Sequence, residues 1–244
     1  MHPILFSIGN FTFYTHGLMA LLGIILGVWI LFRLAKREKF ATSSLLDEIT
    51  YSVFLGIIGA RITYFLMYRS QFSHFSEIFQ IWDGGMVSYG GFVLAGLAFW
   101  YFFSKKKEDI RRWFDLLAIS FAPALILGRI GNIFAGEYSG VATNSKINFA
   151  GVVPVPLYEA LLLLLLSVLL FTLYLKPKKT LKSGLYFSIF MAVYGLGRFV
   201  VDIWRNESNL FLNISHGQVA SLIVGIVGII NLWNYFYHKR KESK

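Results

Sequence analysis

Seven runs of mostly apolar residues constrain this chain more than any other feature. They fall at about 14–33, 49–68, 87–104, 114–134, 155–175, 184–204 and 217–237. Each run is close to the roughly 20 residues that a helix needs to cross the hydrocarbon of a bilayer. Charged residues make up 15% of the chain, whereas soluble domains carry roughly 25%. The sequence therefore predicts an all-α, polytopic integral membrane protein with seven transmembrane helices, forming a single domain over residues 1–244 with short outer loops.

Basic residues are distributed unequally between the two sides that these runs define. One side carries Arg69, Lys146 and Arg205, and the other carries four basic clusters that follow the first, third, fifth and seventh runs. Cytoplasmic loops are enriched in Lys and Arg, so the N-terminus is predicted outside and the C-terminus in the cytoplasm. The net charge of +10 is thus a signal of topology, and we expect no nucleic-acid partner. The clusters are Arg33, Lys36, Arg37 and Lys39; Lys105, Lys106, Lys107, Arg111 and Arg112; Lys176, Lys178, Lys179 and Lys182; and Lys239, Arg240, Lys241 and Lys244.

Three arginines, Arg61, Arg129 and Arg198, fall inside predicted membrane helices. A charge at membrane depth costs at least about 2.5–3.5 kcal/mol, so it indicates a function unless it is paired or reaches the interface. With the predicted orientation, all three lie in the outer half of the membrane. Guanidinium forks in a low-dielectric pocket bind phosphate bidentately. The sequence therefore predicts an outward-facing site for a phospholipid headgroup.

Other polar side chains are predicted near the same outer ends of the helices. Tyr194, Arg198 and Asp202 share one helix face at a spacing of four residues. Glu159 has an alternative interpretation as an ordinary interfacial residue, and the glycine pairs at 84–85 and 90–91 have one as tight helix packing. The chain has no Cys, and neither a metal site nor a cofactor motif is predicted. The remaining members of the outer group are His16, Tyr89, Asn132 and Glu137.

Six segments carry motifs in a fixed order along the chain: Phe6-Ser7-Ile8-Gly9 with His16-Gly17-Leu18-Met19; Gly59-Ala60-Arg61-Ile62 through Tyr68; Trp82-Asp83-Gly84-Gly85-Met86 with Gly90-Gly91; Gly128-Arg129-Ile130-Gly131-Asn132 with Gly136-Glu137 and Gly140; Leu157-Tyr158-Glu159-Ala160; and Tyr194-Gly195-Leu196-Gly197-Arg198-Phe199. In this order they resemble the prolipoprotein diacylglyceryl transferase family of bacteria. The segment from Gly128 to Gly140 is the most specific of the six. The resemblance covers most of the chain.

The resemblance implies an enzyme of the bacterial inner membrane whose active site faces the outer side. Such an enzyme moves the diacylglyceryl group of phosphatidylglycerol to the lipobox cysteine of a preprolipoprotein signal peptide, and glycerol phosphate leaves. A cysteine-free enzyme fits this reaction because the substrate supplies the thiol. By resemblance, the expected catalytic residues are Arg129, Arg198, Tyr89, His16 and Glu137. The expected phosphatidylglycerol-binding residues are Arg129, Arg61, Asn132, Gly90, Gly140 and Tyr194.

The chain departs from the usual family pattern at three positions. Tyr89 stands where the family usually has His before the glycine pair, and Ala135 replaces a common Asn. His16 stands where the family more often has Tyr. Tyr is a poor base at neutral pH, which leaves three interpretations: the base has moved to His16, the arginine field suffices, or the activity has diverged. A non-catalytic protein that binds or transports phospholipid is the alternative from another functional class.

Overall fold

A computed structural model describes residues 3–8, 11–80, 84–176, 183–206, 209–211 and 214–242 of the chain. Several residues used in the sequence analysis lie outside these ranges. They are Gly9, Trp82 and Asp83 of the motifs, and Lys178, Lys179, Lys182 and Lys244 of the basic clusters.

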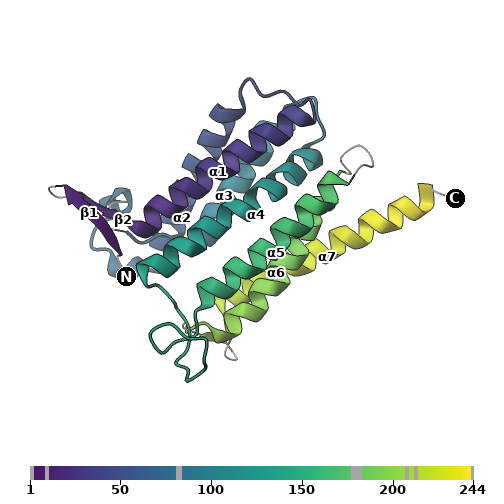
Figure 1. Cartoon of the computed structure of the whole chain (residues 1–244). Coiled ribbons are helices and arrows are strands. Elements are labelled where there is room, and N and C mark those ends of the chain that lie inside the picture. The colour runs from purple at the N-terminus through teal and green to yellow at the C-terminus, as the bar shows by residue number, and fades with distance from the viewer. Residues whose placement is uncertain are drawn as a thin grey trace. The chain divides into compact units, whose positions relative to one another are not determined.

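Each predicted apolar run coincides with an α-helix (Figure 1). Several helices continue past the apolar run into the flanking basic residues, because backbone hydrogen bonding does not stop where the hydrocarbon ends. The helices are α1 (Thr15–Arg37), α2 (Leu45–Met67), α3 (Ser88–Ser104), α4 (Ile110–Ala135), α5 (Val155–Leu175), α6 (Leu185–Val201) and α7 (His216–Glu242).

The all-α class and the multi-pass character are confirmed. Among the described residues, six helices are long and apolar enough to cross a membrane, when α6 is counted together with the turn that continues it to Trp204. The helix α3 has 17 residues, or about 25 Å of helix at 1.5 Å per residue, so seven crossings remain a prediction. Much of the apolar surface points outward: 17% of the residues in the α7 span are buried, and Trp233 is 73% exposed. Such a surface is suited to contact with lipid.

Two small hairpins accompany the helices in the described part of the chain, and the sequence did not predict them. β1 (Ile4–Ile8) pairs antiparallel with β2 (Phe11–Tyr14), and Figure 1 shows this hairpin beyond the first turn of α1. The ring of Phe6 stacks on that of Phe13 with 4.6 Å between centroids. β3 (Asn209–Phe211) pairs with β4 (Ile214–Ser215) just before α7. Aromatic residues that alternate along short segments favour strands.

The chain divides into two compact units. The single domain remains a prediction. The first unit comprises Met1–Leu34 and Phe114–Lys244. In it, α1 and α4 run antiparallel, since a Cβ on Gly23 would lie 2.6 Å from the Ala124 carbonyl oxygen and one on Gly131 would lie 2.7 Å from Met19. Helices α5, α6 and α7 pack on one another in sequence (Figure 1). This packing brings the start of α1, the end of α4, the start of α5 and the end of α6 to the same end of the unit.

The second unit, Ala35–Trp113, is built on the antiparallel pair α2 and α3. Small residues bring these helices together, because a Cβ on Gly59 would lie 2.5 Å from the Gly90 carbonyl oxygen. At the opposite end of the pair, Lys106 forms a 2.9 Å ion pair with Glu48. Two short 3-10 helices, η1 (Arg69–Gln71) and η2 (Phe75–Phe79), follow α2 and lead toward α3.

Candidate functional site

A buried carboxylate holds three arginines together in the first unit. Glu159, in the second turn of α5, has no exposed surface. Its Oε2 lies 2.6 Å from Arg129 Nε, and its Oε1 lies 2.8 Å from Arg198 Nη1. Arg205 Nη2 donates a hydrogen bond of 2.7 Å to the same Oε1. The predicted arginines Arg129 and Arg198 are thus brought to one point by a carboxylate on a third helix.

Asp202 supplies a second carboxylate to this cluster. It begins the 3-10 helix η4 (Asp202–Trp204) and is 3% exposed. Arg205 Nε donates a 2.9 Å hydrogen bond to its Oδ1, and Arg198 Nε lies 3.5 Å from its Oδ2. We call Arg129, Glu159, Arg198, Asp202 and Arg205 the arginine cluster.

Not every close pair in the arginine cluster is a directed hydrogen bond. Glu159 Oε2 and Asp202 Oδ2 have no hydrogen-bond partner among the described residues, although each faces a guanidinium. These contacts are therefore ion pairs, and the two oxygens retain the capacity to accept a hydrogen bond.

Backbone contacts fix the ends of the helices that carry the cluster. Buried Asp115 on α4 accepts hydrogen bonds from the N–H groups of Gly184 (2.7 Å) and Phe187 (2.8 Å) at the start of α6. Such side-chain acceptors satisfy the free N–H groups at a helix N-terminus. At the other end of α6, Val141 N–H donates to the Trp204 carbonyl oxygen at 2.9 Å. The loop after α4 is thereby joined to the segment that carries Arg205.

The cluster has one positive charge in excess, and the terminal nitrogens of Arg129 have no partner among the described residues. Three guanidinium groups face two carboxylates, so one positive charge is not compensated within the cluster. Arg129 uses Nε toward Glu159, and neither of its terminal nitrogens has a partner in the described ranges. The side chains of Arg129 and Arg198 are 21% and 15% exposed. This arrangement leaves the guanidinium fork of Arg129 available to a singly charged anion.

His16 and Glu137 form a second, more open pair at this end of the unit. His16 Nδ1 lies 4.0 Å from Glu137 Oε2, and the two side chains are 47% and 55% exposed. The distance exceeds that of a hydrogen bond, so the two side chains are neighbours that share no hydrogen bond. An apolar cavity of about 590 Å³ adjoins the sequence neighbours of both residues. It is lined by Leu5, Thr15, Met19, Ile133, Phe134, Tyr138 and Phe149.

Three further predicted residues lie around the arginine cluster. Asn132, one turn beyond Arg129 on α4, has a buried Oδ1 without a hydrogen-bond partner among the described residues. The Tyr194 hydroxyl accepts a 3.4 Å hydrogen bond from Arg198 Nη1. Gly140 pairs with Arg205 in an isolated β-bridge, and a Cβ at Gly140 would collide with the Val153 carbonyl. The requirement for glycine at 140 is therefore one of space.

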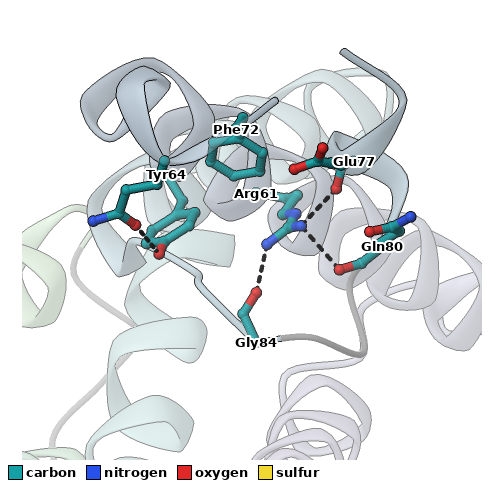
Figure 2. A pocket seen from close by; sticks show the side chains of 7 residues that line it. Arg61, Tyr64, Phe72, Glu77, Gln80 and Gly84 are labelled. Atoms are coloured by element: carbon teal, nitrogen blue, oxygen red, sulfur yellow. Dashed lines mark hydrogen bonds between the residues drawn. The ribbon is translucent and has the colours of Figure 1, made fainter. Parts of the chain in front are cut away.

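The remaining predicted residues belong to the second unit, and their surroundings are different. Arg61 is 5% exposed, and its guanidinium is surrounded by main-chain carbonyls (Figure 2). Gly90 packs against Gly59 and Thr63 with no room for a Cβ, so close packing of α2 and α3 accounts for this glycine. Tyr89 is half-buried in the first turn of α3. No group of His, Asp or Glu side chains suited to a metal occurs in the ranges described.

The chain is similar to known proteins over nearly its whole length. The family model described as prolipoprotein diacylglyceryl transferase matches residues 3–234. A phosphatidylglycerol–prolipoprotein diacylglyceryl transferase from Streptococcus equi subsp. zooepidemicus is 30% identical, with 100% of this chain and 97% of the relative covered. The chain belongs to the prolipoprotein diacylglyceryl transferase family. A Clostridium perfringens relative, named phosphatidylglycerol–prolipoprotein diacylglyceryl transferase 1, is 31% identical over 99% of this chain and 98% of its own length.

Two residues of this prolipoprotein diacylglyceryl transferase family member have surroundings that the sequence did not predict. Glu159 was left open as an interfacial residue, whereas its carboxylate is the centre of the arginine cluster. Arg205 was interpreted as an outer loop charge, whereas its side chain is 12% exposed and contacts both buried carboxylates. A signal for Arg205 was present in the chain, because Asp202 lies within one turn of both Arg198 and Arg205.

Proposed function

We propose that this chain transfers the diacylglyceryl group of phosphatidylglycerol to the lipobox cysteine of preprolipoproteins. The observation that carries this proposal is membership of the family over residues 3–234, with relatives of the same length that bear this activity in their names. The chain is a bacterial-type multi-pass membrane protein. We therefore expect the protein to meet both of its substrates at the membrane.

The reaction exchanges one bond to carbon for another. The cysteine sulfur forms a thioether with the glyceryl carbon that bears the phosphate ester, and the bond between this carbon and the phosphate oxygen breaks. The thiol proton passes to a base, and glycerol phosphate leaves with the electron pair. A free thiol is mostly protonated at neutral pH, so a base or a positive field is needed to form the thiolate.

The arginine cluster supports this chemistry through its charge and its free donors. A phosphodiester carries one negative charge, which matches the single uncompensated charge of the cluster. The terminal nitrogens of Arg129 offer the fork geometry that binds two phosphate oxygens. Donors that are already in place stabilise the charge that develops on the leaving phosphate. We assign phosphate binding to Arg129 and Arg198, with Asn132 and Tyr194 beside them.

Turnover by the purified protein tests the proposed function. The protein is placed in nanodiscs that contain phosphatidylglycerol and is incubated with a peptide bearing a lipobox cysteine. We expect a thioether-linked diacylglyceryl peptide by mass spectrometry and an equal amount of glycerol phosphate. A peptide with Ser in place of the Cys is the control and should give neither product. Binding of phosphatidylglycerol without turnover would reject the transferase in favour of a lipid-binding protein.

The proposed orientation places the arginine cluster and His16 on the outer side of the membrane. Reporter fusions should separate two groups of positions, because the basic clusters are expected in the cytoplasm. A reversed pair of neighbouring fusions would contradict the seven-span topology. Fusions after Lys39, Lys107, Lys179 and Lys244 should report cytoplasm, and fusions near Gln71, Lys146 and Asn209 should report the outer side.

We propose His16 as the base that accepts the thiol proton, with Glu137 as its charged neighbour. His16→Ala should reduce kcat about 10²- to 10⁴-fold, the range for loss of a general base. Tyr89→Phe should stay within about threefold, because a phenol is a poor acceptor at neutral pH. The exchange Tyr89→His with His16→Tyr should retain function. Full activity of His16→Ala, at a normal membrane level, would reassign His16 to the lipid interface.

A further inference from the structure

Every N–H group of Arg61 is used by a main-chain carbonyl. A guanidinium has five N–H donors, and the side chain of Arg61 contacts five carbonyl oxygens on the segment between α2 and α3. Figure 2 shows the guanidinium enclosed by this segment. The acceptors are Ile78 for Nε (2.9 Å), Gly84 and Gly85 (3.0 Å) for Nη1, and Glu77 (2.7 Å) and Gln80 (2.9 Å) for Nη2.

Arg61 and Arg129 differ in the number of N–H donors that are left for a phosphate. Arg129 has two terminal nitrogens without a partner in the described ranges, whereas Arg61 has no donor left. The Arg61 guanidinium also lies 5.8 Å from the Tyr64 ring centroid and 5.4 Å from that of Phe72. A phosphate could contact Arg61 only by displacing carbonyls that would then lose their donors.

The five carbonyls belong to the segment that delivers the chain to α3. Beyond Gly85, the N–H of Val87 donates a 3.1 Å hydrogen bond to the carbonyl of Ala60, the residue that precedes Arg61. The helix α3 then begins at Ser88, and Tyr89 is its second residue. The side chain of Arg61 therefore contacts residues 84 and 85, and the Ala60 carbonyl contacts Val87, just before α3 begins.

We propose that Arg61 is a positioning residue that fixes residues 84–90 on α2, and that catalysis depends on this segment being held in place. This inference rests on the proposed function. It replaces the phosphatidylglycerol contact that the sequence predicts for Arg61. Tyr89→Phe leaves all five Arg61 contacts in place, whereas a change of Arg61 removes some or all of them. The two changes should therefore differ in effect.

The test compares turnover and hydrogen exchange in Arg61→Lys and wild-type protein in nanodiscs. Lysine keeps the charge but has three donors, so at least two of the five carbonyls lose their partner. A displacement of about 1 Å of groups near the reacting atoms can lower the rate about 100-fold. We therefore expect kcat to fall about 10- to 100-fold while KM for phosphatidylglycerol stays within about threefold. Amide exchange should accelerate at residues 84–90 and stay unchanged in α5 and α6.

A second variant displaces the same segment without altering Arg61. Gly85 has a φ of +75°, and a Cβ there would collide with the Tyr64 ring. Gly85→Ala should therefore reproduce the lower kcat and the faster exchange of Arg61→Lys. Gly96→Ala on α3 is the matched control, because a Cβ at Gly96 meets nothing within 4 Å. It should behave as wild type in both measurements.

Two results would overturn the inference. A rise of tenfold or more in KM for phosphatidylglycerol at unchanged kcat in Arg61→Lys would identify a headgroup contact. Unchanged kcat and exchange in both Arg61→Lys and Gly85→Ala would show that the segment needs no such support. An inactive wild-type protein would reject the proposed function separately, and the exchange comparison would still decide whether Arg61 holds residues 84–90.

Discussion

Arg129→Lys is expected to lower turnover of phosphatidylglycerol by about 10²- to 10³-fold, the range for loss of a single preorganised donor to developing negative charge. Lysine keeps the positive charge but loses the planar fork, so it cannot offer two parallel N–H groups to one phosphate. It also loses Nε, through which Arg129 faces Glu159 at 2.6 Å. The measurement is kcat/KM with the lipobox peptide, together with the amount of protein in the membrane.

The companion variant Arg198→Ala should be similarly damaging, because it removes a guanidinium that contacts both Glu159 and Asp202. Arg69→Lys is the control for the change of side chain. Arg69 is exposed and donates to the Phe72 carbonyl at 3.1 Å, outside the arginine cluster. The turnover of Arg69→Lys should stay within about threefold of wild type, because most surface substitutions have small effects. Wild-type activity in Arg129→Lys or Arg198→Ala would assign that arginine to structure.

The helices of this fold could be predicted from the sequence because each membrane crossing leaves one clear signal, a long apolar run. A run of about 20 apolar residues predicts a helix, since a backbone in hydrocarbon must satisfy its own hydrogen bonds. The two hairpins lacked such a signal. In β1 and β2, nine strand residues alternate too briefly to stand out beside the long apolar runs. The start of α2 at Leu45 was missed by four residues, because Asp47 and Glu48 lie in its first turn.

Buried arginines could be found by the same reasoning, but their different surroundings could not. Arg61 and Arg129 both fall within apolar helices, and the sequence predicts a phosphate contact for each. The structure distinguishes them by the number of donors already in use. The carbonyls around Arg61 come from residues 16–24 positions further along the chain, and no side-chain pattern marks such main-chain contacts.

Glu159 shows a further limit of reasoning from one segment at a time. Its motif, Leu157-Tyr158-Glu159-Ala160, places a carboxylate near the start of a helix, where many interfacial residues occur. Its importance comes from partners 30, 39 and 46 residues away on α4, α6 and the segment after η4. The three-dimensional arrangement therefore changes Glu159 from a possible interfacial residue to the common partner of three arginines.

Glu159→Gln is expected to lower stability by about 3–5 kcal/mol, the cost of removing one partner from a buried ion pair. The variant retains the shape of the side chain but leaves three guanidinium groups with Asp202 alone. Its amide N–H₂ would also face N–H donors. We expect less protein in the membrane, a lower Tm in nanodiscs and at least about a 100-fold loss of turnover, since Arg129 and Arg198 lose their common anchor. Ser167→Ala is the control on the same helix, where a buried hydroxyl donates to the Leu163 carbonyl at 2.7 Å.

A charge-balanced double variant separates the electrostatic cause from a general loss of packing. Glu159→Gln with Arg205→Gln removes one negative and one positive charge, which restores a single positive charge in excess. If uncompensated charge is the cause, the second change should recover part of the stability lost by the first, with a coupling of about 0.5–3 kcal/mol. Turnover should stay low, because Arg129 and Arg198 still lack the carboxylate between them. Additive loss of Tm in the double variant would contradict the electrostatic explanation, and wild-type turnover in Glu159→Gln would show that the arginines keep their positions without it.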